Sequence, residues 1–505
     1  MKRLIHNGVI VPKYEPRGFH IGSRGRRIDL TPLQEEMVLA WVKKLGTDYV
    51  KDPVFIQNFF KDFSKAMDLE ETRGPEDFDF SEIMQFVEAE KAKKLAMTRE
   101  ERKRLAQERK AQREANKEKY GYAIVDEQRV ELGNYTVEPA CVFMGRGKHP
   151  LRGRWKRGIK ESEITLNLSE GAPIPLGDWK QTWESNRMWI ARWNDPLSGK
   201  KKYIWFSDSS FIKQKREIEK FDKARELEGD LKKIRDHIDK NLSDSDPLRR
   251  KIATVWYLID HLKFRVGDEK DEDEADTVGA TTLRPEHVQF LNNGNVVFHF
   301  LGKDSVEWNI ETQLPAKVVA NLREFIRSAN SSVFSGVNSS NAKSFLEEVA
   351  KGFTPKVFRT YHATKVVSDS LSRSEVKRDD PLYVKKYEAT MANLGAAKEC
   401  NHKRTLPKNW EQSLVRMDER LRILQAQQET SRTSKQREKR QERVKELQMR
   451  IRLRKETRDY NLNTSLKSYI DPRVYYRWGQ KVGFDWRNYY SKTLQKKFTW
   501  VEERQ

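Results

Sequence analysis

The chain of 505 residues contains only two cysteines, Cys141 and Cys400, which lie far apart in the sequence. They supply neither a disulfide framework nor the four thiolates of a structural zinc site. The nine histidines form no HExxH motif or other paired metal spacing, and no GxxxxGKS or GxxxxGKT loop is present to cradle nucleotide phosphates. We therefore expect chemistry that uses side chains alone, with no cofactor and no metal.

Long apolar runs are also missing. No stretch approaches the roughly 18 residues of a membrane-spanning helix, and the start MKRLIHNGV lacks the apolar segment of a signal peptide. We expect a soluble, intracellular protein without a membrane partner, and the scarcity of cysteine fits a reducing compartment. The hydrophobic content of 37% still suffices for packed cores, so a chain of this length should fold into several domains.

Positive charge is abundant. Lys and Arg number 98 against 76 Asp and Glu, which leaves a net charge of +22. Such an excess suits a partner of dense negative charge, and nucleic acid is the leading candidate. A basic protein of membrane surfaces is the alternative.

The first two segments read as a cap. Residues 1–98 mix turn-rich pieces with helical ones at Leu33–Leu45 and around Phe59, and predict an N-terminal cap module. Residues 99–209 begin with a charged helix over 99–119, since Thr98 and Glu101 form a capping box before a run without Gly or Pro. A β-rich module follows, with strands expected at YAIV, TVEP, EITLNL, MWIARW and KYIWF.

The remaining sequence predicts three further segments. Residues 210–408 have a mainly helical pattern and form the expected α-rich core, with one hairpin whose turn displays Lys303 at its tip. Residues 409–459 contain no Gly or Pro, and two stripes with 3-4-3 spacing predict an antiparallel coiled-coil linker: Leu414, Met417, Leu421 and Leu424, then Val444, Leu447 and Ile451. Residues 460–505 are a compact, aromatic-rich end.

Transfer of a phosphodiester to a side chain would suit these residue types. It requires an attacking oxygen, cations on the non-bridging oxygens and an acid for the leaving alkoxide. Arginine donates two hydrogen bonds to a phosphate and stays charged, a protonated histidine can assist it, and a positioned lysine can deliver the proton. Composition alone does not select which residues act.

Eight motifs make that selection: NGVIVPKYEP, VFIQNFFKDF, PACVFMGRGKHP, DHLKFRVGDEKDEDEADTV, FHFLGKDS, PKVFRTYHAT, CNHKR and TSLKSYIDPR. Together they resemble the eukaryotic type IB DNA topoisomerases over nearly the whole chain. The resemblance implies an α+β, multidomain DNA clamp with a β-containing cap, a tyrosine recombinase-like catalytic core, a coiled-coil linker and a C-terminal tyrosine domain. It implies relaxation of supercoiled DNA by transient cleavage of one strand, rotation and religation, without ATP or metal.

The same resemblance assigns five catalytic residues. Tyr469 in TSLKSYIDPR matches the nucleophile, which forms a 3′-phosphotyrosyl link and frees a 5′-hydroxyl. Arg265, Arg359 and His402 match residues that hold the scissile phosphate oxygens. Lys303 in FLGKDS matches the lysine acid, in agreement with its expected place at a hairpin tip.

Other matching positions contact duplex DNA in the family, and backbone contacts should dominate affinity, so we expect low sequence specificity. These positions are Phe143, Arg146, Lys148, Lys202, Tyr203, Thr277, Asp304, Thr464 and Ser468. Lys156 and Arg157 follow the same glycine-rich stretch and are expected to add phosphate contacts. The resemblance further implies a monomer on DNA, or a heterodimer if the tyrosine segment is naturally a separate subunit. It implies a nuclear location, with a mitochondrial or kinetoplast-type pool as the variant.

The tyrosine motif departs from the family pattern. Lys467 has moved by one place, and Ser468 stands where the family usually has Asn before the tyrosine. Because that Asn takes part in the binding site of camptothecin-type poisons, we expect Ser468 to weaken the response to them. The coiled-coil linker is also shorter than usual.

Other interpretations of these features remain open. The acidic run 268–276 could hold Mg²⁺ in a nuclease, and Cys400 beside His402 invites a metal interpretation. A tyrosine recombinase would use the same nucleophile and Arg pair at specific DNA sites. A basic coiled-coil scaffold on chromatin or RNA would bind without any covalent adduct.

Overall fold

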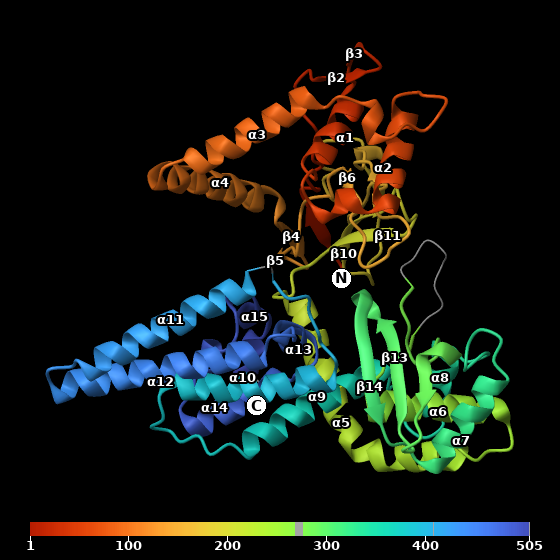
Figure 1. The fold of residues 1–505 in the computed structure, drawn as a ribbon. Helices are drawn as coiled ribbons and strands as arrows, with labels where there is room; N and C mark the ends of the chain where they lie inside the picture. The colour runs from red at the N-terminus through yellow and green to blue at the C-terminus, as the bar shows by residue number, and fades with distance from the viewer. Residues whose placement is uncertain (268–275, 408, 504–505) are drawn as a thin grey trace. The chain divides into compact units, whose positions relative to one another are not determined.

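The computed structural model describes residues 1–267, 276–407 and 409–503, without the side chain of Asp304. Helices and sheets are both present, as expected for the α+β class (Figure 1). The chain divides into two compact units, with the boundary between Lys213 and Gln214. Within the described ranges, no helix is long and apolar enough to cross a membrane.

The helical part of the first unit packs around aromatic side chains. Trp41 lies 4.8 Å, between ring centroids, from both Phe59 and Phe60. The elements are β2 (His20–Ser23), β3 (Arg26–Asp29), α1 (Pro32–Val42), α2 (Pro53–Ala66), α3 (Ser81–Ala96) and α4 (Arg99–Tyr120). The helices expected near Leu33 and Phe59 are confirmed as α1 and α2. The capping box at the start of α4 is present as predicted, and no residue of this helix is buried.

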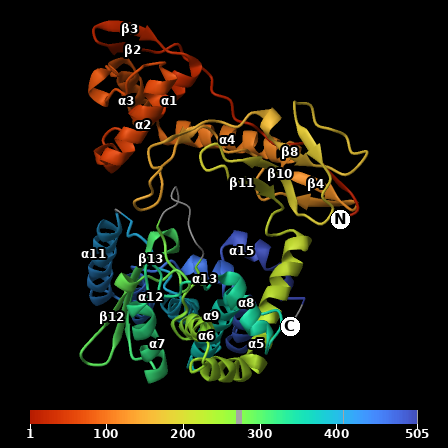
Figure 2. The same ribbon diagram turned by 90° about the vertical axis from the view of Figure 1, so that its right-hand side faces the viewer.

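The β-rich part of the first unit contains β4 (Tyr122–Val125), β5 (Gln128–Glu131), β6 (Cys141–Val142), β7 (Trp155–Lys156), β8 (Thr165–Asn167), β9 (Lys180–Thr182), β10 (Trp189–Asn194) and β11 (Lys201–Trp205). One sheet has the order β11-β10-β8-β9, and the smaller sheet beside it includes β4 and β5 (Figure 2). The strand expected at TVEP is wrong, because Thr136 makes only an isolated bridge with Ile10 before Pro139. A strand at the chain start, β1 (Leu4–His6), pairs with β4, so residues 1–98 and 99–209 share a sheet.

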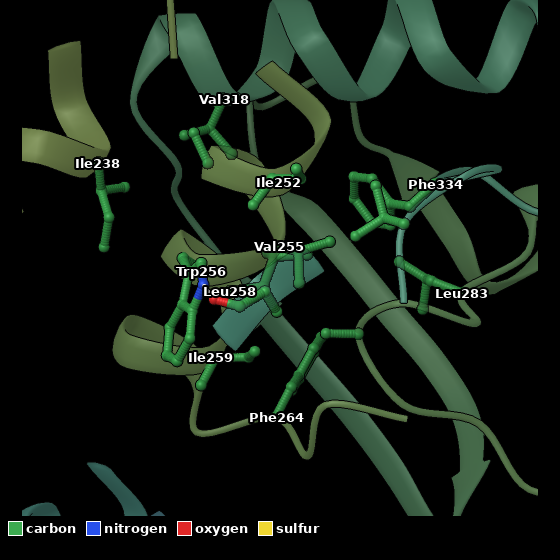
Figure 3. Close-up of a cluster of buried hydrophobic side chains, with 14 of the residues drawn as sticks. Ile238, Ile252, Val255, Trp256, Leu258, Ile259, Phe264, Leu283, Val318 and Phe334 are labelled. Atoms are coloured by element: carbon green, nitrogen blue, oxygen red, sulfur yellow. Dashed lines mark hydrogen bonds between the residues drawn. The ribbon is translucent and has the colours of Figure 1, made fainter. Parts of the chain in front are cut away.

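The second unit has two cores, and the first contains a sheet. α5 (Phe211–Asn241), α6 (Pro247–Leu262), α7 (Ala316–Arg327) and α8 (Ser339–Glu347) surround β12 (Val288–Phe290), β13 (Val296–Gly302) and β14 (Val306–Thr312). Figure 3 shows Trp256 and Ile259 of α6 within this core, together with Phe264 just after the helix. The predicted hairpin is confirmed as β13–β14, with its turn at Lys303–Ser305.

The second core joins the C-terminal segment to the middle of the chain. It is formed by α9 (Pro355–Ser372), α10 (Leu382–Glu399), α13 (Leu462–Ser468), α14 (Pro472–Val482) and α15 (Lys492–Lys497), with part of α5. α11 (Trp410–Glu429) and α12 (Ser434–Glu456) lie side by side as a helical hairpin (Figure 1). Val444, Leu447 and Ile451 are buried in α12, as their spacing predicted.

Candidate active site

Arg265 lies in a short extended segment directly after α6. Lys263 ends this helix in the left-handed conformation, with φ at 59°. The next side chain, Phe264, is fully buried against the rings of Phe298, Phe300 and Trp308, at 5.1 to 5.3 Å between centroids. The Arg265 guanidinium is directed instead to the Tyr469 phenol.

Arg359 is carried by α9 and is only 3% exposed. Its guanidinium donates to the backbone carbonyls of Lys263 and Cys400, the latter at 2.9 Å. These bonds tie the turn that precedes Arg265 to the end of α10. The Nε of Arg359 is buried and has no hydrogen-bond partner among the described residues. A buried charged donor without an acceptor is costly, so the site is built to receive an acceptor there.

His402 follows α10 after a tight turn. Asn401 has a φ of 50°, and the His402 amide donates to the Ala397 carbonyl at 2.8 Å. The imidazole is 5% exposed; its Nδ1 lies 2.7 Å from the Ser465 hydroxyl oxygen, and its Nε2 lies 3.5 Å from the Arg359 guanidinium. Burial, followed by the positive charges of Arg359 and Arg265, lowers the pKa of His402 to about 3. The protonated histidine considered from sequence is therefore replaced by a neutral imidazole.

Tyr469 stands at the end of α13 and is 6% exposed. Its phenol oxygen accepts a hydrogen bond from Arg265 Nη1 at 3.1 Å. The ring stacks on His402 at 5.2 Å between centroids, and the Arg359 guanidinium lies 5.4 Å from the ring centre. Burial alone would raise the pKa of Tyr469, but the charges and hydrogen bonds of Arg265 and Arg359 outweigh it, and the pKa lies below its ordinary value.

The backbone around Tyr469 is held from two sides. The Thr364 hydroxyl on α9 donates to the Tyr469 carbonyl at 3.1 Å and accepts from the Asp471 amide at 3.0 Å. Two lysines hold the preceding carbonyls: Lys220 donates to that of Ser468 at 3.3 Å, and Lys497 donates to that of Lys467 at 2.9 Å. Glu217 pairs with both of these lysines. Burial lowers the pKa of Lys220 to about 8 despite this carboxylate.

Lys303 occupies the tip of the β13–β14 hairpin and is exposed. Its turn packs closely, because a Cβ on the preceding Gly302 would lie 2.8 Å from the Trp308 ring. Within the described part of the chain, Lys303 makes no hydrogen bond or ion pair, and it is not gathered into the cluster of the other four residues. An exposed lysine on a hairpin tip is free to reach a bound ligand.

The remaining expected contacts of the second unit lie on several elements. Thr277 lines a pocket of about 680 Å³ that also includes Ser332 and Arg284. Thr464 and Ser468 lie on α13 and are half-buried. The side chain of Asp304 and the acidic run 268–275 fall outside the described residues.

The described residues for which a metal interpretation was open have other surroundings. Asp276 pairs with Arg284 at 2.8 Å. Cys400 is buried beside the Arg359 guanidinium, and burial raises the pKa of its thiol. Among the residues that the structure describes, no group of three or more His, Cys, Asp or Glu side chains could hold a metal ion.

The expected contacts in the first unit lie in the loop around Arg146 and on β11, where Lys202 pairs with Glu138 at 3.9 Å and with Asp195 at 4.0 Å. Phe143 is half-buried, with its ring edge to face against His149 at 4.9 Å, and Arg146 and Lys148 are exposed in the following loop. Lys202 and Tyr203 are half-buried neighbours on β11.

Lys156 and Arg157, for which phosphate contacts were expected, both form ion pairs within the fold. Lys156 is 8% exposed, and its ammonium is paired with both Glu138 and Asp195. The Arg157 guanidinium makes two bonds to Glu163, at 2.7 and 2.5 Å. Both charges are paired with carboxylates within the fold, and Lys156 is also buried, which argues against a phosphate contact from Lys156.

Sequence reasoning missed the residues that support the site. Ser465 lies inside the motif TSLKSYIDPR, yet its contact with His402 spans 63 residues of chain. Thr364 lies in the motif PKVFRTYHAT, where alternating polar residues gave no reason to single it out. No local signal links Lys220 or Lys497 to the site, because the carbonyls that they hold, those of Ser468 and Lys467, are distant in sequence.

The four gathered side chains suit one kind of ligand. A phenol, two guanidinium groups and an imidazole lie together, and the described carboxylates nearby pair with other residues. Guanidinium groups and an imidazole can donate to the non-bridging oxygens of a phosphodiester, and the phenol can attack its phosphorus. The arrangement can therefore hold a phosphodiester and transfer it to Tyr469.

Comparison with known proteins agrees with this chemistry. Three family models match: the catalytic core of eukaryotic DNA topoisomerase I over residues 209–436, its DNA binding fragment over 1–206, and the C-terminal topoisomerase domain over 441–505. DNA topoisomerase 1 of Candidozyma auris is 37% identical over 84% of this chain and 58% of its own length. DNA topoisomerase 1 beta of Arabidopsis thaliana is 34% identical over 99% of this chain and 58% of its own length. DNA topoisomerase 1 of Homo sapiens is 30% identical over 99% of this chain and 70% of its own length. The chain thus spans somewhat over half the length of the first two relatives.

Proposed function

The chain belongs to the eukaryotic DNA topoisomerase I family, and from this premise we propose that it relaxes supercoiled DNA by cutting and resealing one strand of the duplex through Tyr469. One observation carries the proposal. The Tyr469 phenol accepts a hydrogen bond from Arg265 and lies against both Arg359 and His402, which come from separate parts of the chain. Packing alone would not require two guanidinium groups beside the tyrosine, one of them with a buried Nε that has no partner among the described residues.

Cleavage begins with attack of the Tyr469 oxygen on the scissile phosphorus. The new bond is a 3′-phosphotyrosyl ester, and the bond to the 5′-oxygen of the next nucleotide breaks. The phenol proton leaves to solvent, which is easier because Arg265 and Arg359 lower the pKa of Tyr469. The leaving 5′-oxygen takes a proton from Lys303, whose free position on the hairpin tip permits the approach.

Arg265, Arg359 and His402 hold the non-bridging oxygens of the phosphate during this step. The unpartnered Nε of Arg359 is one donor that such an oxygen would satisfy. Removal of one donor of this type typically costs about 3 to 4 kcal/mol of transition-state stabilisation. Religation is the reverse reaction, in which the 5′-hydroxyl attacks the tyrosyl ester. The ester conserves the energy of the phosphodiester, so neither ATP nor a metal ion is required.

The rest of the chain would bind and guide the duplex. We assign residues 1–98 and 99–209 to the cap, 210–408 to a recombinase-like catalytic core, 409–459 to the coiled-coil linker and 460–505 to the tyrosine domain. Backbone contacts would come from Phe143, Arg146, Lys148, Arg157, Lys202, Tyr203, Thr277, Asp304, Thr464 and Ser468. The net charge of +22 supports a clamp of low sequence specificity. Action as a monomer on DNA in the nucleus completes the proposal.

Two rival functions make different predictions. A tyrosine recombinase would exchange strands at specific sites, whereas the family matches span a topoisomerase DNA binding fragment as well as the core. A basic scaffold on chromatin or RNA would bind without a covalent adduct. The buried cluster around Tyr469 argues against the scaffold, since binding alone would not need it.

Relaxation of supercoiled plasmid in EDTA, without ATP, tests the proposal. The unaltered chain should relax the plasmid and form a covalent adduct with DNA, whereas Tyr469→Phe should do neither. Tyr476→Phe is the matched control, because Tyr476 is a half-buried tyrosine on α14 outside the cluster. Relaxation by Tyr469→Phe at the rate of the unaltered chain would refute the assignment of the nucleophile.

A further inference from the structure

Ser465 and His402 form a buried pair behind the nucleophile. The Ser465 side chain is fully buried and the His402 ring is 5% exposed. Their contact joins Nδ1 of the imidazole to the serine hydroxyl oxygen over 2.7 Å. On the other side of the ring, Nε2 lies 3.5 Å from Nη2 of Arg359. Water is therefore a poor substitute for either partner of the imidazole.

The two partners of His402 fix where its proton resides in the free protein. A neutral imidazole carries one proton, and the pKa of His402 near 3 keeps the ring neutral at working pH. Arg359 can only donate, so its 3.5 Å contact favours Nε2 as the acceptor, with the proton on Nδ1. The Ser465 hydroxyl then accepts the hydrogen bond from Nδ1.

Cleavage demands the opposite arrangement, on the condition that the proposed function is correct. A non-bridging phosphate oxygen can only accept, so a neutral His402 must present an N–H to it from Nε2. Nδ1 then becomes an acceptor and needs a donor inside a buried site. A hydroxyl can serve either arrangement by rotation, whereas a carboxylate or a lysine in that place could serve only one.

We propose that Ser465 is a positioning residue that controls the tautomer of His402. In the free protein its hydroxyl accepts from Nδ1–H. With a scissile phosphate bound, a phosphate oxygen replaces Arg359 Nη2 as the partner of Nε2, the proton is exchanged through solvent from Nδ1 to Nε2, and the Ser465 hydroxyl rotates to donate to Nδ1. The imidazole thus becomes a phosphate donor without acquiring a charge.

The location of Ser465 ties this control to the nucleophile. It lies on α13, four residues before Tyr469, and its carbonyl accepts from the Tyr469 amide at 2.9 Å. The Tyr469 ring stacks on the imidazole and limits its rotation, so the tautomer can change while the ring stays in place. The segment that brings the nucleophile therefore also brings the group that prepares His402.

Nitrogen NMR of protein labelled with ¹⁵N-histidine reads the tautomer directly. The His402 signals are assigned by their loss in His402→Gln. In the free protein they should report a proton on Nδ1. In Tyr469→Phe bound to a duplex oligonucleotide, which cannot form the covalent adduct, they should report a proton on Nε2. The same tautomer in both states would overturn the proposal.

Kinetics of Ser465 variants provide the second readout. Ser465→Ala should reduce single-turnover cleavage of a duplex oligonucleotide by about tenfold, the effect of one hydrogen bond, with unchanged DNA affinity. Ser465→Thr keeps the hydroxyl and should restore most of the rate. Ser372→Ala, a serine on the exposed end of α9, is the matched control. Equal cleavage rates for Ser465→Ala and the unaltered chain would contradict the proposal.

The two readouts separate this proposal from the proposed function. Absence of any cleavage by the unaltered chain would refute the topoisomerase activity, whereas the tautomer of the free protein tests the Ser465 contact by itself. Thermal unfolding shows whether each variant folds. If Ser465→Ala or Ser465→Thr does not fold, the comparison of free and DNA-bound tautomers decides alone.

Discussion

The Thr364 hydroxyl makes a sharp prediction, because one oxygen fixes the chain on both sides of Ile470. It donates to the Tyr469 carbonyl and accepts from the Asp471 amide, at 3.1 and 3.0 Å. Tyr469 and Asp471 are 6% and 4% exposed, so their backbone groups have few alternatives. Thr364→Val keeps the shape of the side chain and removes both hydrogen bonds.

The magnitude follows from the groups left without partners. Each hydrogen bond contributes about 1 kcal/mol, and each buried group left unsatisfied costs about 1 to 3 kcal/mol. Thr364 itself is half-buried and lines a cavity of about 220 Å³, from which water can replace part of the loss. We therefore expect the lower end, about 2 kcal/mol against local opening. At about 1.4 kcal/mol for each factor of ten, this equals a roughly 30-fold increase in opening of the segment.

Hydrogen exchange of the Asp471 amide measures that opening. Exchange at this amide should accelerate about 30-fold in Thr364→Val, while Thr364→Ser keeps the hydroxyl and should stay close to the unaltered chain. Single-turnover cleavage should also be slower in Thr364→Val than in Thr364→Ser, since the Tyr469 oxygen is less often in place. An unchanged exchange rate in Thr364→Val would refute the view that this hydroxyl holds the nucleophile.

Four further predictions follow, three on charged residues and one on drug response. Arg265→Gln should raise the pKa of Tyr469, because it removes a positive charge and a hydrogen bond that favour the phenolate. Absorbance at alkaline pH measures the shift, with Tyr469→Phe as the reference. An unchanged pKa of Tyr469 would refute the electrostatic account. Lys303→Ala should slow cleavage of ordinary DNA at least 100-fold, as expected for a lost general acid. The same variant should cleave a substrate with sulfur at the leaving position at nearly the normal rate, since a thiolate leaves without a proton. Ser468→Asn should increase the yield of camptothecin-trapped cleavage complexes; full drug sensitivity of the unaltered chain would contradict this. Lys156→Met should destabilise the first unit by about 3 to 5 kcal/mol, seen as a lower melting temperature, and should leave the salt dependence of DNA binding unchanged.

Local patterns predicted much of the fold. The capping box at Thr98, the β13–β14 hairpin and the buried stripe of α12 depend on residues close in sequence, and each is present. The pairing of β1 with β4 was missed, since these strands lie more than a hundred residues apart and neither shows which partner it takes. The strand predicted at TVEP is absent, because only Thr136 in this segment forms a bridge with another described part of the chain.

The candidate site shows the same contrast between what local sequence predicts and what distant contacts determine. Motifs identified Arg265, Arg359, His402 and Tyr469, which the fold gathers around one phenol. The neutral state of His402 was not predictable, because it results from burial next to two guanidinium groups. The ion pairs of Lys156 were not predictable for a similar reason. Its partners, Glu138 and Asp195, are distant in sequence, and they pair with a charge that the sequence analysis assigned to DNA.

The helical hairpin α11–α12 separates His402 from Tyr469 in sequence but not in space. Its two ends meet beside the site: Lys403 bridges Tyr460, the Arg404 amide donates to Asp459 at 2.9 Å, and the Asn461 amide donates to the His402 carbonyl at 2.7 Å. These backbone bonds fix α13 against the end of α10 directly, so the catalytic geometry does not depend on the length of the hairpin between them. The hairpin can therefore vary in length while Ser465 and Tyr469 keep their places against His402.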